Sequence, residues 1–381
     1  MVDIIQTNIK PRTDILLVAS VILLTGLGLV TLYSSSYAYA ELFFGSKLYF
    51  IKRQLIYGSI GITLFIAAAH INLDIIRKAA FPLIIVSLVL CILTFVPGIG
   101  LERNGASRWI LIGSRPYQPS EMVKLALPLY LAYLFDKKQD NLNTFKSGVL
   151  PQVLVTAVFF ILIHRQNNFS TAVFIAINAL VIFFLAGIRL RYFIAAAFLF
   201  IPLSAVLLLT KEHRVRRLIS FIQPQWDPQG AGYQVRQSIN TISSGGFWGR
   251  GIGQGVRKIS SVPEVYADFI FSAYSEEAGY IGVLLFVILL AVFAVRGYKG
   301  AFYADTMFKR LLAASLVTTI ISQALLNIAV VSGSLPATGV PLPFFSAGGS
   351  SLVTTLICAG LIVNIARHTD KDSVQENLYG E

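Results

Sequence analysis

The sequence is poor in charged residues and in cysteine. Only 13% of its 381 residues are Asp, Glu, Lys or Arg, about half the share of roughly 25% found in soluble domains. This shortage excludes an ordinary cytosolic enzyme and a disordered chain. Both cysteines, Cys91 and Cys358, lie inside apolar segments, so the sequence indicates no disulfide framework.

Hydrophobic residues make up 55% of the chain, and its mean hydropathy is +0.71. They fall in runs of roughly 17 to 25 residues, long enough to cross a bilayer core of about 30 Å. We therefore predict an all-α polytopic membrane protein with about ten transmembrane helices, in which residues 1–381 form a single domain. The predicted spans are 14–34, 53–70, 79–97, 118–135, 147–164, 170–188, 191–210, 274–295, 309–332 and 350–367.

Lys and Arg residues are unevenly shared between the two sides of these spans. The termini and the short connections on one side hold fifteen, against seven in the short connections on the other side. The positive-inside rule then places both termini in the cytoplasm. Residues 368–381 form a short, polar cytoplasmic tail in this topology, and we predict that the tail is disordered.

One long extracytoplasmic loop, residues 211–267, joins the seventh and eighth predicted spans. It carries eight further Lys and Arg residues on the outer side, against the positive-inside trend. One interpretation is that these charges bind an anion; the other is that long loops cross the membrane whatever their charge. A formal net charge of +12 suits lipid headgroups or an anionic lipid-linked substrate, and we expect no nucleic-acid partner.

Glu121 and Lys124 stand at the start of the fourth span, where polar residues are costly enough to be functional candidates. Their spacing places them on one helix face, so they can pair. Either they form an ion pair that locks helix packing, or Lys124 faces a cavity and holds a phosphate while Glu121 holds Lys124. Just before this span, we expect Trp109 at the membrane interface and Arg108 beside headgroup phosphates. An interfacial anchor is the simpler interpretation of these two residues.

The long loop holds the densest set of arginine, glycine and aromatic residues, beginning with Arg214, Arg216 and Arg217. Six glycines among residues 245–255 require tight turns and close approach of the backbone, whose N–H groups can hold oxyanions. No strand precedes this run and no βαβ unit follows it, so it is not a nucleotide-binding fingerprint. Glutamine, asparagine and tryptophan side chains in the loop suit sugar hydroxyls and sugar faces.

Asp268 lies at the boundary of the eighth span, next to apolar Phe269. Partial desolvation raises the pKa of a carboxyl group and makes it a better general base than a free carboxylate. The alternative is a helix N-cap, for which Asp is a preferred residue.

The last connection, residues 335–351, contains three prolines and several small residues, which exclude a regular helix. An apolar non-helical stretch at membrane depth is buried in protein or lines a cavity, and Ser350 or Ser351 can cap the tenth span. In the ninth span, Gln323 and Asn327 are four residues apart on one face, where they can bond neighbouring helices.

Taken together, these segments resemble the SEDS family of bacterial cell-wall synthases, whose members include FtsW and RodA. The resemblance covers nearly the whole chain, and the order and spacing of the motifs match. Residues 323–327 and 338–339 are closer to the FtsW type. The motifs are Gly105-Ala106-Ser107-Arg108-Trp109, Gln118-Pro119-Ser120-Glu121 with Lys124, Gly232-Tyr233-Gln234, Pro263-Glu264 with Asp268-Phe269, and Pro341-Leu342-Pro343-Phe344 with Gly348-Gly349-Ser350-Ser351.

The resemblance implies a protein that polymerises peptidoglycan glycan strands from lipid II beside a class B penicillin-binding protein, which makes the crosslinks. It implies a catalytic aspartate at Asp268, a functional pair at Glu121 and Lys124, and a loop lysine at Lys258. Further candidate substrate-binding residues lie in or beside the motifs: Tyr233, Gln234, Ser346 and Ser350.

The chain departs from the family pattern at three places. Tyr266-Ala267 stands where the family usually has His-Thr before the aspartate, and Ala347 stands where it usually has Tyr. Residues 166–171 lack the acidic residue that the family usually has there. None of these departures alters the aspartate, glutamate or lysine named above, so activity is still expected.

The implied reaction is an inverting glycosyl transfer. Asp268 deprotonates the 4-hydroxyl of the acceptor sugar, which attacks the anomeric carbon of the lipid-linked donor and releases a polyprenyl pyrophosphate. The departing anion needs positive charge. No His, Cys or carboxylate cluster in the sequence marks a metal site, so a divalent cation, Mg²⁺ or Mn²⁺, would be held mainly by the pyrophosphate. The candidate cationic side chains are Lys124, Arg108, Arg217 and Lys258.

Two other functions fit the same residues. A flippase for lipid II would use the Glu121–Lys124 pair and a central cavity, whereas a scaffold for the division or elongation machinery would tolerate loss of Asp268. A transporter concentrates polar groups near the membrane midplane, but this chain has them on the outer side. The sequence therefore favours an enzyme of the bacterial cytoplasmic (inner) membrane.

Overall fold

The computed structural model describes residues 13–103, 105–113, 115–142, 144–210, 212–223, 230–255 and 266–379. Each of the ten predicted spans is a helix, which confirms the all-α polytopic fold class. Among the described residues, eight helical stretches are long and apolar enough to cross a membrane, and the shorter apolar α6 adds to them. The ten helices are α1 Ile15–Phe44, α2 Tyr49–His70, α3 Leu73–Leu93, α4 Pro119–Lys137, α5 Leu150–Arg165, α6 Phe169–Leu185, α7 Leu190–Leu209, α11 Ile270–Phe302, α12 Met307–Val331 and α13 Gly349–Tyr379.

Local chemistry explains where several helices begin. The Asp14 carboxylate accepts a hydrogen bond of 3.1 Å from the Leu17 N–H and caps α1, and Thr306 caps α12 in the same way. Pro119 opens α4, where the missing N–H of proline costs no helical hydrogen bond. These starts match the polar residues that border the apolar runs in the sequence.

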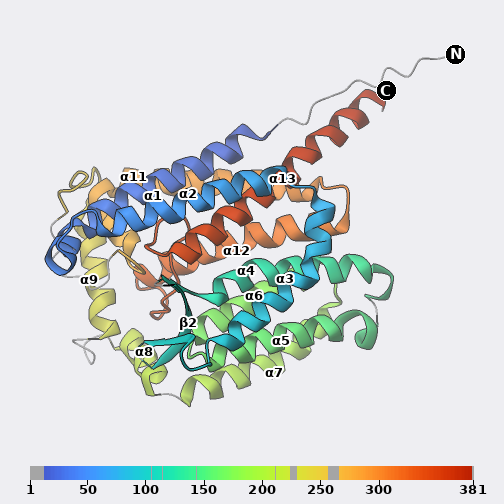
Figure 1. Ribbon diagram of the computed structural model, residues 1–381, viewed down its shortest axis with the longest axis horizontal. Helices are drawn as coiled ribbons and strands as arrows, with labels where there is room; N and C mark the ends of the chain where they lie inside the picture. The colour runs from blue at the N-terminus through green and yellow to red at the C-terminus, as the bar shows by residue number, and fades with distance from the viewer. Residues whose placement is uncertain are drawn as a thin grey trace.

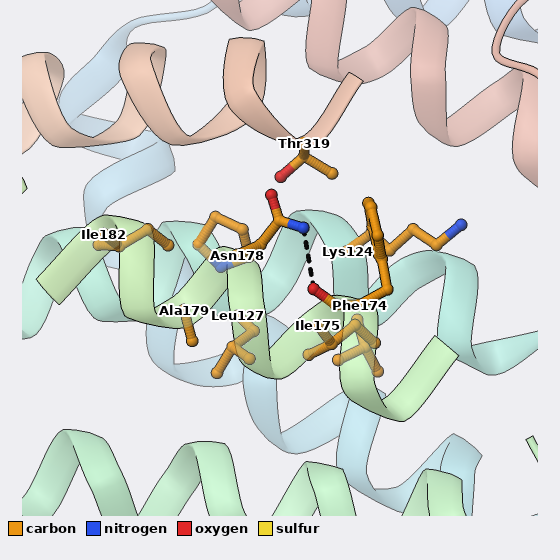
Figure 2. Close-up of a pocket in the computed structure, with 10 residues that line it drawn as sticks. Lys124, Leu127, Phe174, Ile175, Asn178, Ala179, Ile182 and Thr319 are labelled. Carbon is orange, nitrogen blue, oxygen red and sulfur yellow. Dashed lines mark hydrogen bonds between the residues drawn. The ribbon is translucent and has the colours of Figure 1, made fainter. Parts of the chain in front are cut away.

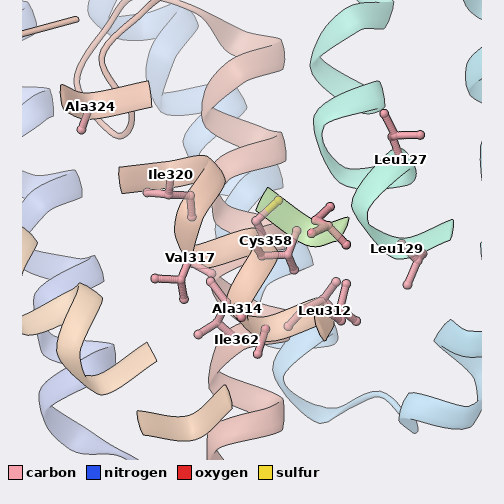
Figure 3. Close-up of a cluster of buried hydrophobic side chains, with 14 of the residues drawn as sticks. Leu127, Leu129, Leu312, Ala314, Val317, Ile320, Ala324, Cys358 and Ile362 are labelled. Carbon is pink, nitrogen blue, oxygen red and sulfur yellow. The ribbon is translucent and has the colours of Figure 1, made fainter. Parts of the chain in front are cut away.

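The core of the bundle lies around α12 and α13. Apolar side chains of these two helices pack together, including Val317, Ile320, Cys358 and Ile362, and α4 adds Leu127 and Leu129 to the same buried cluster (Figure 3). By contrast, no described side chain in the apolar stretch of α7 is buried. Both cysteines are buried and unbonded to each other, as the sequence predicted.

A small antiparallel sheet between α3 and α4 was not predicted. Its strands are β1 Gly100–Arg103, β2 Ala106–Ile112 and β3 Arg115–Tyr117, in the order β1-β2-β3. Strand β2 is central, with Leu101 opposite Trp109 on one side and Leu111 opposite Pro116 on the other. Arg108 and Trp109 therefore lie on a strand rather than in an irregular loop.

The long connection after α7 is also more ordered than the sequence suggested. It contains α8 Glu212–Ile222 and α9 Ala231–Ser244, followed by the glycine-rich turns up to Gly255. Two short helical segments, Gln139–Asn141 and Phe145–Val149, lie between α4 and α5. The prediction of disorder for residues 368–381 was wrong for residues 368–379, because α13 continues through them.

The sheet, α8 and α9 lie together at one end of the bundle, whereas α13 ends at the opposite end (Figure 1). The connections that carry Asp268 and Pro341 lead into α11 and α13 from the same end as the sheet. The fold thus brings together polar segments that are far apart in the sequence.

Candidate functional site

Asp268 lies in a turn directly before α11. The N-cap position of α11 is Phe269, and no side chain caps this helix, so the capping alternative for Asp268 is not supported. The Asp268 side chain is half-buried. A Cβ atom placed on Gly339 would lie 3.4 Å from Asp268 Oδ2, so the connection between α12 and α13 borders the carboxylate directly.

Three successive backbone carbonyls at this turn each accept a hydrogen bond. The Ala347 N–H donates to the Tyr266 carbonyl at 3.0 Å. The Ser346 hydroxyl donates to the Ala267 carbonyl at 2.7 Å. The Asn327 amide donates to the Asp268 carbonyl at 2.8 Å. These three hydrogen bonds fix the backbone of the turn, and the conformation of the turn sets the position of the Asp268 carboxylate.

Ser346 was predicted as a substrate-binding residue, but in the structure its hydroxyl makes hydrogen bonds within the protein. Besides donating to Ala267, the Ser346 Oγ atom accepts a hydrogen bond of 2.8 Å from the Leu342 N–H. Its own carbonyl accepts a hydrogen bond of 3.1 Å from the Gln54 amide of α2. Ser346 therefore joins the connection between α12 and α13 to the aspartate turn.

Arg108 on β2 interacts electrostatically with the Asp268 carboxylate and with two arginines of α8, Arg214 and Arg217. Burial lowers the pKa of the Arg108 guanidinium; the charges of Arg217 and Arg214 also lower it, whereas the Asp268 carboxylate raises it. Arg108 thus interacts with two further cations and one carboxylate at the end of the bundle. Such a cluster can bind an anion with more than one negative charge.

Each of these arginines is anchored by a backbone carbonyl. Arg108 donates to the Asn167 carbonyl, and Arg217 donates to the Ala337 carbonyl at 3.2 Å. Arg214 donates to the Leu207 carbonyl at 2.7 Å and lies over the Phe169 ring at 5.1 Å. Since a guanidinium has five N–H donors, these bonds leave further donors for a ligand.

Glu121 and Lys124 form the predicted ion pair, with 2.8 Å between Lys124 Nζ and Glu121 Oε1 and side-chain exposures of 5% and 4%. Lys124 also donates to Gln323 Oε1 at 2.9 Å. The Gln323 amide in turn donates to the Pro341 carbonyl at 2.9 Å. The lysine is therefore part of a buried network that ends on the connection beside Asp268, and binding a phosphate would require it to leave these partners.

A small pocket lies between α4, α6 and α12, and most of its lining is apolar. Asn178 donates to the Phe174 carbonyl at 2.9 Å within it, and the aliphatic part of Lys124 and Thr319 lie at its edge. Figure 2 shows the Lys124 ammonium group directed away from Asn178 and Thr319. The pocket contains neither Asp268 nor the three arginines, so it is separate from the candidate site.

The glycine-rich residues 245–255 fold against a break in α11 at Gly279 (φ 63°). A Cβ atom on Gly249 would lie 2.1 Å from the Glu277 carbonyl oxygen, so the two backbones are in direct contact. The Gly253 N–H donates to the Glu277 carboxylate at 2.9 Å, and the Ser34 hydroxyl donates to the same oxygen. The sequence predicted that this segment can hold an oxyanion, and the anion held at Gly253 is a carboxylate of the chain itself.

The other predicted residues are placed as follows. Tyr233 and Gln234 lie in α9, half-buried, one turn before Ser238, whose hydroxyl donates to the Val331 carbonyl at 2.8 Å. Ser350 lies in the first turn of α13, where its hydroxyl accepts a hydrogen bond of 3.3 Å from the Gln118 N–H. Lys258 lies outside the described residues.

Two residues of the site were not selected from the sequence as functional: Arg214 and Asn327. The signal for Arg214 was its spacing of three from Arg217, which places both on one helix face. Asn327 was interpreted as a contact between helices, but its amide bonds the Asp268 turn instead.

A metal ion would need a different set of side chains. Within the described part of the chain, no three His, Cys, Asp or Glu residues are close enough to share a metal ion. Three arginines beside one aspartate do not form a donor set for Mg²⁺ or Mn²⁺, which prefer several oxygen ligands. A cation carried by the pyrophosphate itself stays a prediction.

Comparison with known proteins identifies relatives over nearly the whole chain. The family described as "Cell cycle protein", comprising FtsW, RodA and SpoVE, matches residues 14–371. The probable peptidoglycan glycosyltransferase FtsW of Geobacter sulfurreducens is 37% identical over 361 residues, covering 94% of this chain and 97% of that protein. The stage V sporulation protein E of Bacillus subtilis is 34% identical over 364 residues, covering 96% and 100%.

Solved structures show the same fold. A chain from a peptidoglycan synthase complex, in which polymerization and crosslinking are coordinated, matches with a TM-score of 0.77 and 27% identity, covering 94% of this chain and 98% of that one. The rod shape determining protein RodA of Thermus thermophilus matches with a TM-score of 0.69 and 25% identity, covering 93% and 97%.

Proposed function

This chain belongs to the FtsW, RodA and SpoVE family, and from that premise we propose that it is a peptidoglycan glycosyltransferase of the FtsW type that polymerises lipid II during cell division. The observation that carries this proposal is the half-buried Asp268 carboxylate at the end of the bundle where Arg108 interacts with it and with Arg214 and Arg217. A general base next to a cationic anion site is the arrangement that glycosyl transfer from a pyrophosphate donor requires.

Asp268 acts as the general base. Its carboxylate takes the proton of the acceptor sugar's 4-hydroxyl while that oxygen forms a bond to the anomeric carbon of the donor. The bond between the anomeric carbon and the pyrophosphate oxygen breaks, and its electron pair leaves with the polyprenyl pyrophosphate. Because the nucleophile attacks the face opposite the leaving group, an α-linked donor gives a β-linked product.

The arginines stabilise the leaving group. Negative charge on the pyrophosphate oxygens grows as the bond breaks, and guanidinium groups bind such oxygens through paired N–H donors. Arg108, Arg214 and Arg217 are already anchored by backbone carbonyls, so little reorganisation is needed during the reaction. A divalent cation bound to the pyrophosphate would add positive charge at the same place.

The proposed topology places the site on the outer face of the bacterial cytoplasmic membrane, with both termini in the cytoplasm. The excess of Lys and Arg in the termini and short connections on the side away from the site, fifteen against seven, supports this orientation. As partner we propose a class B penicillin-binding protein, together with other parts of the division machinery. The structural likeness to a chain of a peptidoglycan synthase complex supports this pairing.

The test is a glycan-chain assay with purified protein, its cognate penicillin-binding protein, lipid II and Mg²⁺ or Mn²⁺. We expect polymer from the wild type and none from Asp268→Asn, which keeps the size of the side chain but cannot accept the proton. Asp305→Asn is the matched control, because Asp305 is exposed and pairs with Lys309 at the beginning of α12.

Each outcome is informative. Polymer from Asp268→Asn at the wild-type rate would exclude Asp268 as the base. If the folded wild type makes no polymer but moves lipid II across a vesicle membrane, the protein is a flippase. If it does neither and still binds the division machinery, it is a scaffold.

A further inference from the structure

We propose that Asn327 is a positioning residue for this reaction, because its amide fixes the backbone of Asp268 from the neighbouring helix α12. The inference rests on the proposed function of Asp268. Asn327 does not need to touch the substrate in order to act in this way. Its effect is to hold the turn from which the carboxylate projects.

The Asn327 side chain is almost fully buried, with 1% exposed. Its Nδ2 atom donates two hydrogen bonds of 2.8 Å, one to the Asp268 carbonyl and one to the Val340 carbonyl. Because carbonyl oxygens only accept hydrogen bonds, the NH₂ end of the amide must face both of them. One side chain therefore joins the aspartate turn to the connection that borders its carboxylate.

The turn needs such donors because its backbone has left regular structure. Residues 266–269 form turns ahead of α11, and buried carbonyl groups without a partner are costly. Ala347, Ser346 and Asn327 supply donors to the three carbonyls in succession. Of the three donors, only Asn327 comes from a transmembrane helix, so Asn327 fixes the position of Asp268 along the axis of the helix bundle.

Gln323, one turn earlier on α12, extends the same arrangement. Lys124 can only donate, and the Pro341 carbonyl can only accept, so the orientation of the Gln323 amide is fixed at both ends. Gln323 thus bonds Pro341 while Asn327 bonds the adjacent Val340. The buried Glu121–Lys124 pair thus reaches the connection beside Asp268 through the Gln323 amide, at a distance from the substrate.

The substitution Asn327→Asp tests this inference with little change in size. It replaces the NH₂ group, which supplies both donors, with one oxygen atom that faces two carbonyl oxygens. A displacement of about 1 Å at a reacting group can lower a rate about 100-fold. We therefore expect kcat for polymerisation to fall about 10- to 100-fold, while KM for lipid II changes less than about threefold, because the arginines remain in place.

Asn364 on α13 is a matched control. It is fully buried and its Nδ2 atom donates to two carbonyls, Ala68 at 2.8 Å and Ile71 at 2.7 Å. Those carbonyls end α2 and do not belong to the Asp268 turn. Asn364→Asp should therefore cost similar stability without a selective fall in kcat. In case either Asp variant fails to fold, Asn327→Leu and Asn364→Leu repeat the comparison without a charge.

A second readout does not depend on polymerisation. In Asp268→Cys, the rate of labelling by a water-soluble maleimide reports how firmly the turn is held, since the native Cys91 and Cys358 are both buried. We expect Asn327→Leu to change this rate severalfold and Asn364→Leu to leave it unchanged. A wild type without polymerase activity would refute the proposed function and leave this comparison intact.

The inference is overturned by either of two results. One is an equal loss of kcat in the Asn327 and Asn364 variants, which would show a general effect on packing. The other is an unchanged labelling rate in Asn327→Leu together with wild-type kcat in Asn327→Asp.

Discussion

Breaking the Glu121–Lys124 pair should destabilise the protein strongly, and replacing both partners should not. Lys124→Met leaves the Glu121 carboxylate buried without its cation, and Glu121→Gln leaves the Lys124 ammonium buried without its anion. The two groups are 2.8 Å apart and at most 5% exposed. The double variant Glu121→Gln with Lys124→Met removes both charges and keeps similar volumes.

The magnitude follows from this burial. Removing one partner of a buried ion pair costs about 3–5 kcal/mol, whereas replacing both with neutral groups of similar size is close to neutral. The Asp305–Lys309 pair is a matched control, because its atoms are as close, at 2.7 Å, but its side chains are 46% and 19% exposed. An exposed pair contributes about 0–1 kcal/mol, so Asp305→Asn should have little effect.

Thermal unfolding in detergent gives the measurement, with a dye that becomes fluorescent on reacting with thiols. Cys91 and Cys358 are buried, so they react only as the bundle opens. We expect both single variants to unfold well below the wild type and the double variant to lie near it. A single variant as stable as the wild type, or a double variant less stable than both singles, would refute the reasoning.

The double variant also separates stability from activity. It recovers the fold but loses the hydrogen bond from Lys124 to Gln323. Its kcat should therefore stay below that of the wild type even where its unfolding temperature does not.

Three further predictions follow from local geometry. Gly249→Ala should cost about 2–5 kcal/mol of unfolding free energy, because its Cβ would lie 2.1 Å from a backbone carbonyl oxygen of α11 at a φ of +79°. Gly253→Ala, at a φ of +82° with no atom within 4 Å of the added Cβ, should cost only about 1–2 kcal/mol in the same unfolding assay. Arg217→Gln should raise KM for lipid II about 10-fold or more through loss of a charged hydrogen bond. Arg216→Gln on the same helix should leave KM unchanged. Equal KM values in the two variants would contradict the role of Arg217 in binding the pyrophosphate. Burial raises the pKa of Tyr117 to about 12, so the folded chain keeps a proton that the unfolded chain releases near pH 10. The unfolding free energy of the protein should therefore fall as the pH rises from about 10 toward 12. In Tyr117→Phe this fall should be smaller.

The ten helices were predictable because long apolar runs leave few alternatives in a membrane. The sheet was missed because strands of four, seven and three residues are too short to show a clear alternation. The helices α8 and α9 were missed because polar, arginine-rich and glycine-rich sequence was treated as a loop. Amphipathic spacing around Arg214 and Arg217 was the available signal for α8.

Asp268, Arg108 and Arg217 could be selected from the sequence because a carboxylate and several cations at a membrane boundary are unusual. Their proximity follows from topology, since each lies in a connection at the same end of the bundle. The contact between Asn327 and the Asp268 carbonyl joins residues 59 positions apart and depends on how α12 packs beside α11. No spacing rule in the sequence carries that information, so Asn327 could only be interpreted as a contact between helices.

The hydrogen bonds that hold the aspartate turn also bear on how the sequence can vary. All three donors meet backbone carbonyl oxygens, at Tyr266, Ala267 and Asp268, and a carbonyl is the same whichever side chain its residue carries. This chain has Tyr-Ala at the two positions where the SEDS family usually has His-Thr, and the bonds to those positions are formed all the same. These backbone bonds therefore place no restriction on the side chains at 266 and 267, and the choice at 266 is set instead by packing, since the Tyr266 ring lies 4.4 Å from the Phe50 ring and 5.2 Å from the Tyr39 ring.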